Sequence, residues 1–136
     1  LSRRHQGAAR DRVLTVELLA CESCGGADRD ANGHTRGQRL LAQLRELASD
    51  QLHVAPTRCL WNCQRSCSLH IRSEGRAGYV LGDFDASVDT ARAILEWTAL
   101  YAASADGAVP FKTWPAAMRG HFVCRIPPPP THEESP

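Results

Sequence analysis

The sequence predicts a single α/β domain, and three observations lead to this expectation. Short apolar, β-branched segments alternate with two stretches that have the 3.6-residue spacing of amphipathic helices. The 136 residues are enough for one domain, and no stretch of the chain is repeated. The polar ends set the expected boundaries: a flexible basic arm over 1–12, a folded domain over 13–126 and a disordered Pro-rich tail over 127–136.

The first half of the domain is predicted to form a strand, a helix and a second strand. The apolar run 13–20 is typical of a buried strand. Thr35, with Gln38 three residues later, is a capping-box signal, so a leucine-rich helix should begin there. Residues 52–56 then predict another short strand.

The second half is predicted to form a hairpin followed by a helix. Residues 68–72 and 78–82 flank a glycine-containing turn, as hairpin strands do. Helical spacing of apolar residues covers roughly 88–104. Residues 122–126 are expected to form only a last extended piece.

The resulting order, β-α-β-β-β-α, is that of a thioredoxin-like fold with a four-stranded mixed sheet. The first crossover should be right-handed, so the first two strands should lie parallel in the sheet. Because parallel strands end at the same edge, we expect the loops that follow these two strands to lie close together.

Five of the six cysteines fall in those two loops. Cys21 and Cys24 form a Cys-x-x-Cys pair, whereas Cys59, Cys63 and Cys67 stand at four-residue intervals. We expect the two groups to form one thiolate site. In a cytoplasmic protein, which we expect this to be, such cysteines indicate metal or redox chemistry before structural disulfides.

A [2Fe–2S] cluster is the first candidate for this site, because four Cys thiolates complete such a centre. We expect Cys21, Cys24, Cys59 and Cys63 as the ligands. Cys67 ranks fifth because the residues that follow it are predicted to enter a strand at once.

Two other chemistries remain open on the residues alone. A tetrahedral Cys₄ zinc site also uses Cys-x-x-Cys, and the spacing does not exclude it. A thiol–disulfide oxidoreductase would use Cys21 and Cys24 as a redox pair, although such a pair normally opens a helix and here a loop follows.

Composition argues against several other classes. The net charge is +1 and aromatic residues make up 6% of the chain, so no nucleic-acid partner is indicated. No apolar run approaches the length of a membrane span. No nucleophile triad or phosphate-binding loop is visible, so we do not expect an enzyme with its own substrate.

Two family resemblances arise at the cysteines. The run from Cys59 to Cys63, followed by an apolar strand, a Gly turn and Tyr79-Val80, resembles the second half of the thioredoxin-like [2Fe–2S] ferredoxins. That resemblance implies one-electron transfer to a redox protein partner, with Cys59 and Cys63 as matched ligands and Cys21 as the third. Where the ferredoxins have their other cysteine this chain has residues 32–34, so Cys24 or Cys67 would take the fourth place.

The chain from about Val16 to Pro127 also resembles a bacterial family of unknown function described as small predicted metal-binding proteins. The matching marks are Cys21-x-x-Cys24, the triplet Cys59 to Cys67, Gly82-Asp83, and the run 100–107 with Pro110. This resemblance implies metal handling, with a link to cobalamin or cobalt metabolism. The leading expectation is therefore a ferredoxin-like electron carrier, monomeric or homodimeric. The alternative is a zinc- or cobalt-binding module with a structural or metal-delivery role.

Overall fold

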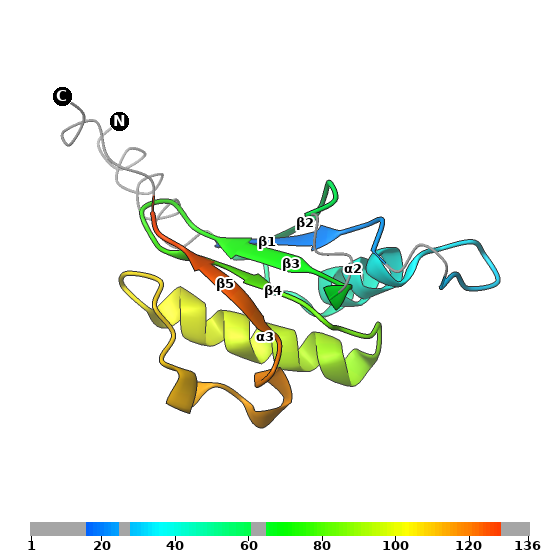
Figure 1. The fold of residues 1–136 in the computed structure, drawn as a ribbon. Helices are drawn as coiled ribbons and strands as arrows, with labels where there is room; N and C mark the ends of the chain where they lie inside the picture. The colour runs from blue at the N-terminus through cyan, green and yellow to red at the C-terminus, as the bar shows by residue number, and fades with distance from the viewer. Residues whose placement is uncertain (1–15, 25–27, 61–64, 129–136) are drawn as a thin grey trace, which may run out of the picture.

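The computed structural model describes residues 16–24, 28–60 and 65–128. It is a mixed α/β domain in which a five-stranded sheet packs against two neighbouring helices (Figure 1). The elements in chain order are β1 (Val16–Cys21), α2 (Arg36–Leu47), β2 (Leu52–Thr57), β3 (Leu69–Arg72), β4 (Gly78–Leu81), α3 (Val88–Ala103), the 3₁₀ turns η2 (Phe111–Thr113) and η3 (Ala116–Met118), and β5 (Phe122–Ile126).

The strands are arranged in the order β2-β1-β3-β4-β5. β1 and β2 are parallel, with Val16 opposite Leu52 and Cys21 opposite Thr57, whereas every other neighbouring pair is antiparallel. The predicted parallel pairing is therefore confirmed. It places the loops after β1 and β2 at the same edge of the sheet.

The expectation of a four-stranded sheet is wrong, because residues 122–126 form a fifth strand beside β4. The segment has no buried face: four of its five side chains are exposed and one is half-buried. A strand without a buried face lacks the alternating pattern from which strands are predicted. Residues 122–126 form a strand because their backbone pairs with the edge of β4, and the pattern of their side chains does not predict it.

Both helices begin where the capping residues predict. Thr35 Oγ1 accepts from Gln38 N at 3.0 Å, and Thr35 N donates to Gln38 Oε1 at 2.8 Å, which completes the capping box. Ser87 caps α3 by accepting from Thr90 N at 3.1 Å. The predicted arm over 1–12 and most of the predicted tail after 127 lie outside the described part of the chain.

An aromatic cluster fills the core between α3 and the sheet. Tyr79 lies edge-to-face against Trp97, with ring centroids 4.9 Å apart, and Trp97 lies edge-to-face against Trp114 at 5.4 Å. The Trp114 indole donates to Val109 O at 2.9 Å, and Val109 N donates to the Tyr79 hydroxyl at 2.9 Å. These bonds tie the segment after α3 to the core. No described helix is both long and apolar enough to cross a membrane.

The run 100–107 has a structural explanation at the end of α3. The buried Arg76 guanidinium donates to Ala102 O at 3.1 Å, a carbonyl in the last helical turn, and at 3.4 Å to Tyr101 O, which also accepts from Ser104 N at 3.0 Å. The Tyr101 hydroxyl donates to Ala77 O. Gly107 has φ +84° and approaches so closely that a Cβ would lie 2.7 Å from Ala77 O.

We expect Gly107→Ala to lower the free energy of unfolding by about 2–3 kcal/mol, because the substitution adds a clash with backbone to a left-handed conformation. Gly120→Ala is the matched control, since φ is +92° there but nothing lies within 4 Å of the added Cβ. The control should cost only about 1 kcal/mol. Equal losses for the two variants in urea unfolding would contradict the close approach.

Candidate metal centre

Three of the expected cysteines converge at one edge of the sheet. Cys21 ends β1, Cys24 follows after a short turn, and Cys67 lies two residues before β3. None of them exposes more than 6% of its surface. The structure therefore brings together the first cysteine pair and the residue that the sequence ranked fifth.

Backbone hydrogen bonds around β3 hold these three residues in place. Cys21 N donates to Ser68 O at 3.1 Å, and Ser68 N donates to the Cys24 sulfur at 3.4 Å. Cys67 and Phe84 exchange two backbone hydrogen bonds of 3.3 and 3.4 Å. The antiparallel entry of β3 thus fixes Cys67 beside the end of β1.

The first turn of α2 packs directly on the turn that carries the cysteine pair. Thr35 Oγ1 donates to Glu22 O, and Gly37 N donates to Cys24 O at 3.1 Å. A Cβ at Gly37 would overlap the carbonyl oxygen of Cys21. Only glycine allows the helix to approach the Cys21–Cys24 backbone this closely.

The Cys24 and Cys67 thiols differ in the direction in which their pKa values are shifted. The hydrogen bond from Cys24 to Cys67 raises the pKa of Cys24, and burial raises it further. The same hydrogen bond lowers the pKa of Cys67, burial opposes that shift, and the positive charges of Arg36 and Arg39 assist it. Cys67 is therefore the sulfur that ionises before Cys24.

Arg36 and Arg39 are functional candidates that the sequence reasoning missed. Asp28 orients both, at 3.1 Å from Arg36 Nε and 2.9 Å from Arg39 Nη2, and Arg36 Nη1 donates to Ser66 O at 3.3 Å. The sequence contains a signal that could have found them. Two arginines in the first turn of a helix are unfavourable with its dipole, and that turn contains no acidic residue to offset them. Such an arrangement is favourable when negative charge lies nearby.

A second arginine network holds the loop that leads into Cys67. Arg65 binds Asp83 Oδ2 at 2.6 Å, and it donates to Phe122 O and Gly120 O at 2.8 Å each. Asp83 has φ +69° and donates its N–H back to Arg65 O at 2.7 Å. Asp83 is thus a turn residue, and it joins the Cys67 loop to the entry of β5.

The remaining expected ligands are placed less completely. Cys59 follows β2 and is exposed. Cys63 is one of residues 61–64, which lie outside the described part of the chain. Within 16–24, 28–60 and 65–128, no group of three or more Cys, His, Asp or Glu side chains has an arrangement that could hold a metal ion. The ligand set expected from the sequence accordingly stays a prediction.

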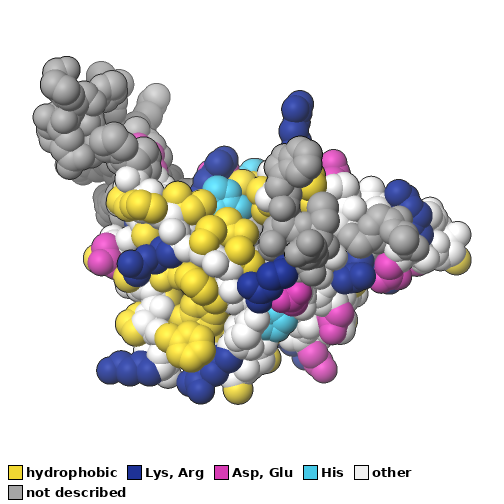
Figure 2. Space-filling model, viewed as in Figure 1, with side chains coloured by type: hydrophobic (Ala, Val, Ile, Leu, Met, Phe, Trp, Pro, Cys, Tyr) yellow, Lys and Arg dark blue, Asp and Glu magenta, His cyan; other side chains and the backbone are white. Residues whose placement is uncertain are grey.

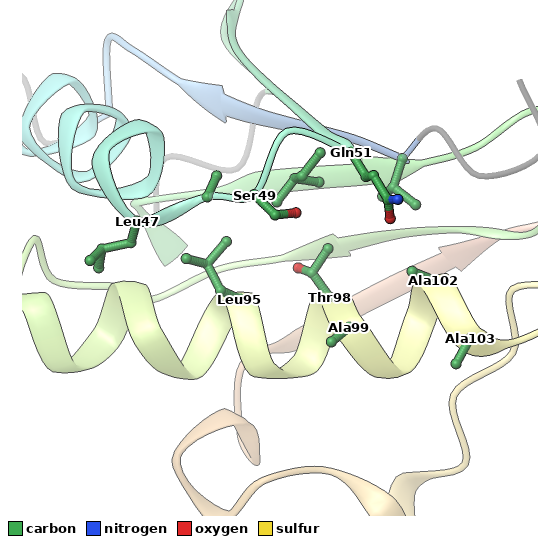
Figure 3. Close-up of a pocket in the computed structure, with 11 residues that line it drawn as sticks. Leu47, Ser49, Gln51, Leu95, Thr98, Ala99, Ala102 and Ala103 are labelled. Carbon is green, nitrogen blue, oxygen red and sulfur yellow. The ribbon is translucent and has the colours of Figure 1, made fainter. Parts of the chain in front are cut away.

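An open groove lies at the opposite end of β1 and β2 from the cysteines. Leu95, Thr98 and Ala102 project from α3 towards the segment that carries Ser49 and Gln51 (Figure 3). All of the side chains that line the groove are apolar or neutral. The groove therefore offers no acid–base or metal-ligand chemistry, and the thiol cluster remains the candidate site.

The fold and the site define a mixed α/β domain with buried thiols at the end of β1 and just before β3. The chain belongs to the family described as "Protein of unknown function (DUF1636)", whose model matches residues 18–128. Comparison with curated proteins found no match, and neither did comparison with solved structures.

Gly37→Ala provides a test of how α2 is docked on the cysteine turn. Glycine to alanine inside a helix ordinarily stabilises a protein by about 0.5–1 kcal/mol. Here we expect the opposite sign, with a loss of about 2 kcal/mol or more, because the new Cβ must push Cys21 away. Glu46→Ala, on the exposed side of the same helix, should be near neutral in the same urea titration. A stabilised Gly37→Ala protein would contradict the observed packing.

Proposed function

We propose that this protein binds a metal centre through cysteine thiolates, and that the centre is a [2Fe–2S] cluster used for one-electron transfer. The observation that supports this function is the convergence of Cys21, Cys24 and Cys67 from two loops into a buried group. Sulfur donors suit iron–sulfur clusters and zinc, whereas magnesium and calcium prefer oxygen. A bound cluster would supply the capacity to accept and release one electron.

The proposed ligands are Cys21, Cys24 and Cys67, with the fourth thiolate from Cys59 or Cys63. In this set Cys67 is a ligand, whereas the sequence alone ranked it fifth among the five candidates. Cys67 is 1% exposed and shares a hydrogen bond with Cys24, whereas Cys59 is exposed. In the structure these three side chains are not arranged to hold a metal ion. On binding they would rearrange, lose their thiol protons and exchange their hydrogen bonds for bonds to metal.

The surroundings of the sulfur atoms suit a negatively charged centre. Arg36 and Arg39 place positive charge near Cys67, and Asp28 holds both in position. The Ser68 N–H already points at the Cys24 sulfur. Hydrogen bonds to sulfur and nearby positive charge both raise the potential of an iron–sulfur centre.

A thioredoxin-like arrangement is part of the proposal. The segment β2-β1-β3-β4, with one parallel and two antiparallel pairings, supports this description, and β5 would be an addition at the edge. On this proposal the protein is cytoplasmic, has no substrate of its own and exchanges electrons with a redox protein. A link to cobalamin or cobalt metabolism is carried over from the resemblance noted above.

A zinc or cobalt site is the second candidate, and one observation favours it. Cys24 lies within hydrogen-bonding reach of both Cys21 and Cys67. With a rearrangement of their side chains around one point, these cysteines would suit a single tetrahedral ion, which needs no room for bridging sulfide. Such a module would store or deliver the metal, or would use it to stabilise its own fold.

Analysis of anaerobically purified protein separates these functions. A [2Fe–2S] carrier should contain two iron and two sulfide per chain, show visible absorption that bleaches with dithionite, and give an EPR signal after reduction. A colourless protein with one zinc per chain would contradict the electron-carrier proposal and support the second candidate. Protein with neither metal after expression in iron- and zinc-supplemented medium would contradict both.

Replacement of Cys67 tests the proposed ligand set. Cys67→Ser should lose most of the bound metal and lower the melting temperature by several degrees, because metal binding and folding are coupled. Cys124→Ser is the control: Cys124 is exposed on β5, so the variant should keep its metal. Full metal content in Cys67→Ser, together with loss of metal in Cys59→Ser and Cys63→Ser, would restore the ranking expected from the sequence.

A further inference from the structure

The two edges of the sheet differ in how they are protected. At one edge, β2 contains Pro56, which has no N–H, and Val54 O accepts from Arg45 Nε at 3.3 Å. At the other edge, β5 contains no proline; Arg65 binds its Phe122 O, and its pairing with β4 has a register shift at Val80/Leu81, so the part of β5 from Cys124 to Ile126 is the less protected. An unprotected edge strand is a template for pairing with another strand.

The side chains of β5 are unusually apolar for an exposed strand. Phe122 is 43% and Ile126 is 39% exposed, although both are large hydrophobic residues. Phe111, 56% exposed, extends this surface through its contact with Trp114, which in turn packs against Phe122. Figure 2 shows hydrophobic side chains gathered on the face that carries β5.

We propose that β5 pairs antiparallel with β5 of a second copy of this chain, centred on Cys124. The five residues are symmetric about that centre, so Phe122 lies opposite Ile126 of the partner subunit, and the register shift against β4 falls on the Phe122 side of the centre. In this register Phe122 of each subunit covers Ile126 of the other, so both exposed apolar side chains of β5 become buried. Pro127 and Pro128 follow at once and end the pairing, since proline cannot donate to a ladder.

The charges on β5 are compatible with a second copy. Arg125 lies opposite Val123 of the partner subunit in this register, so the two arginines do not face each other directly. Asp106 lies within electrostatic reach of Arg125 and offsets its charge. The strand therefore meets its own copy without opposed like charges, which otherwise destabilise such pairs.

The register makes a covalent test available at Cys124. Residues directly opposite in an antiparallel pair have Cα atoms about 4.5 or 5.5 Å apart, depending on the type of pair. A disulfide needs about 4.4–6.8 Å. Glutathione disulfide should therefore convert two Cys124 thiols into one intersubunit disulfide, and the two electrons and two protons leave as two molecules of reduced glutathione.

The experiment measures the mass of the full chain in solution, by light scattering and sedimentation equilibrium over a concentration series. We expect a dimer whose dissociation constant rises about tenfold or more in Ile126→Lys, because the new ammonium group faces Phe122 of the partner subunit. Leu100→Lys is the matched control: Leu100 is 37% exposed but lies on α3, so the dimer should be unchanged. A monomer at every concentration, or a dimer weakened by Leu100→Lys and not by Ile126→Lys, would overturn the proposal.

Peptide mapping after glutathione disulfide treatment completes the test. A Cys124–Cys124 peptide that disappears in Cys124→Ser, while that variant remains dimeric without oxidant, supports the centred register. Linkage only through Cys59 or Cys63 would overturn it. Metal content should be the same in all three variants, so this result is separate from the outcome for the thiolate site.

Discussion

Thr35 and Gly37 pack the first turn of α2 directly against the backbone that carries Cys21 and Cys24. The candidate site depends on this contact, because it fixes the cysteine turn while both sulfur atoms stay buried. The contact needs two particular residues at the start of α2: a capping hydroxyl that also donates to the turn, and, two positions later, a residue without a Cβ. The same helix start brings Arg36 and Arg39 beside Cys67, so scaffold and electrostatics come from one element.

The other side of the site is built by the sheet. Pairing of β1 with β3 aligns Ser68 with the end of β1. Phe84 holds the backbone of Cys67, and Asp83 holds Arg65, two residues earlier in the same loop. Arg65 then joins that loop to the backbone at the entry of β5. Hydrogen bonds therefore link the entry of β5 to the loop that carries Cys67.

Local signals account for the parts of the fold that could be predicted. Signals that act over a few residues can be recognised from the sequence. They include the capping box at Thr35, the serine at the start of α3 and the apolar runs of β1 to β4. β5 was not predictable as a strand, because its exposed side chains carry no alternation and its partner is distant in sequence. The run 100–107 could be recognised as the end of a helix. The contacts that fix it, from Arg76 to Ala102 O and from Tyr101 to Ala77 O, are seen only in the structure.

Spacing and periodicity predicted the α/β class and the grouping of the cysteines after β1 and β2, and the match over residues 18–128 gives the family. Spacing did not indicate which sulfur atoms meet in the folded chain. From the sequence, Cys67 ranks last among the candidate ligands because a strand follows it at once. That strand pairs with β1, and the pairing places Cys67 within hydrogen-bonding reach of Cys24. Proximity of this kind depends on strand pairing and on the close approach of α2, and neither distance is encoded in local spacing. The charge that lowers the pKa of Cys67 likewise comes from a helix some thirty residues earlier, which only folding brings to it.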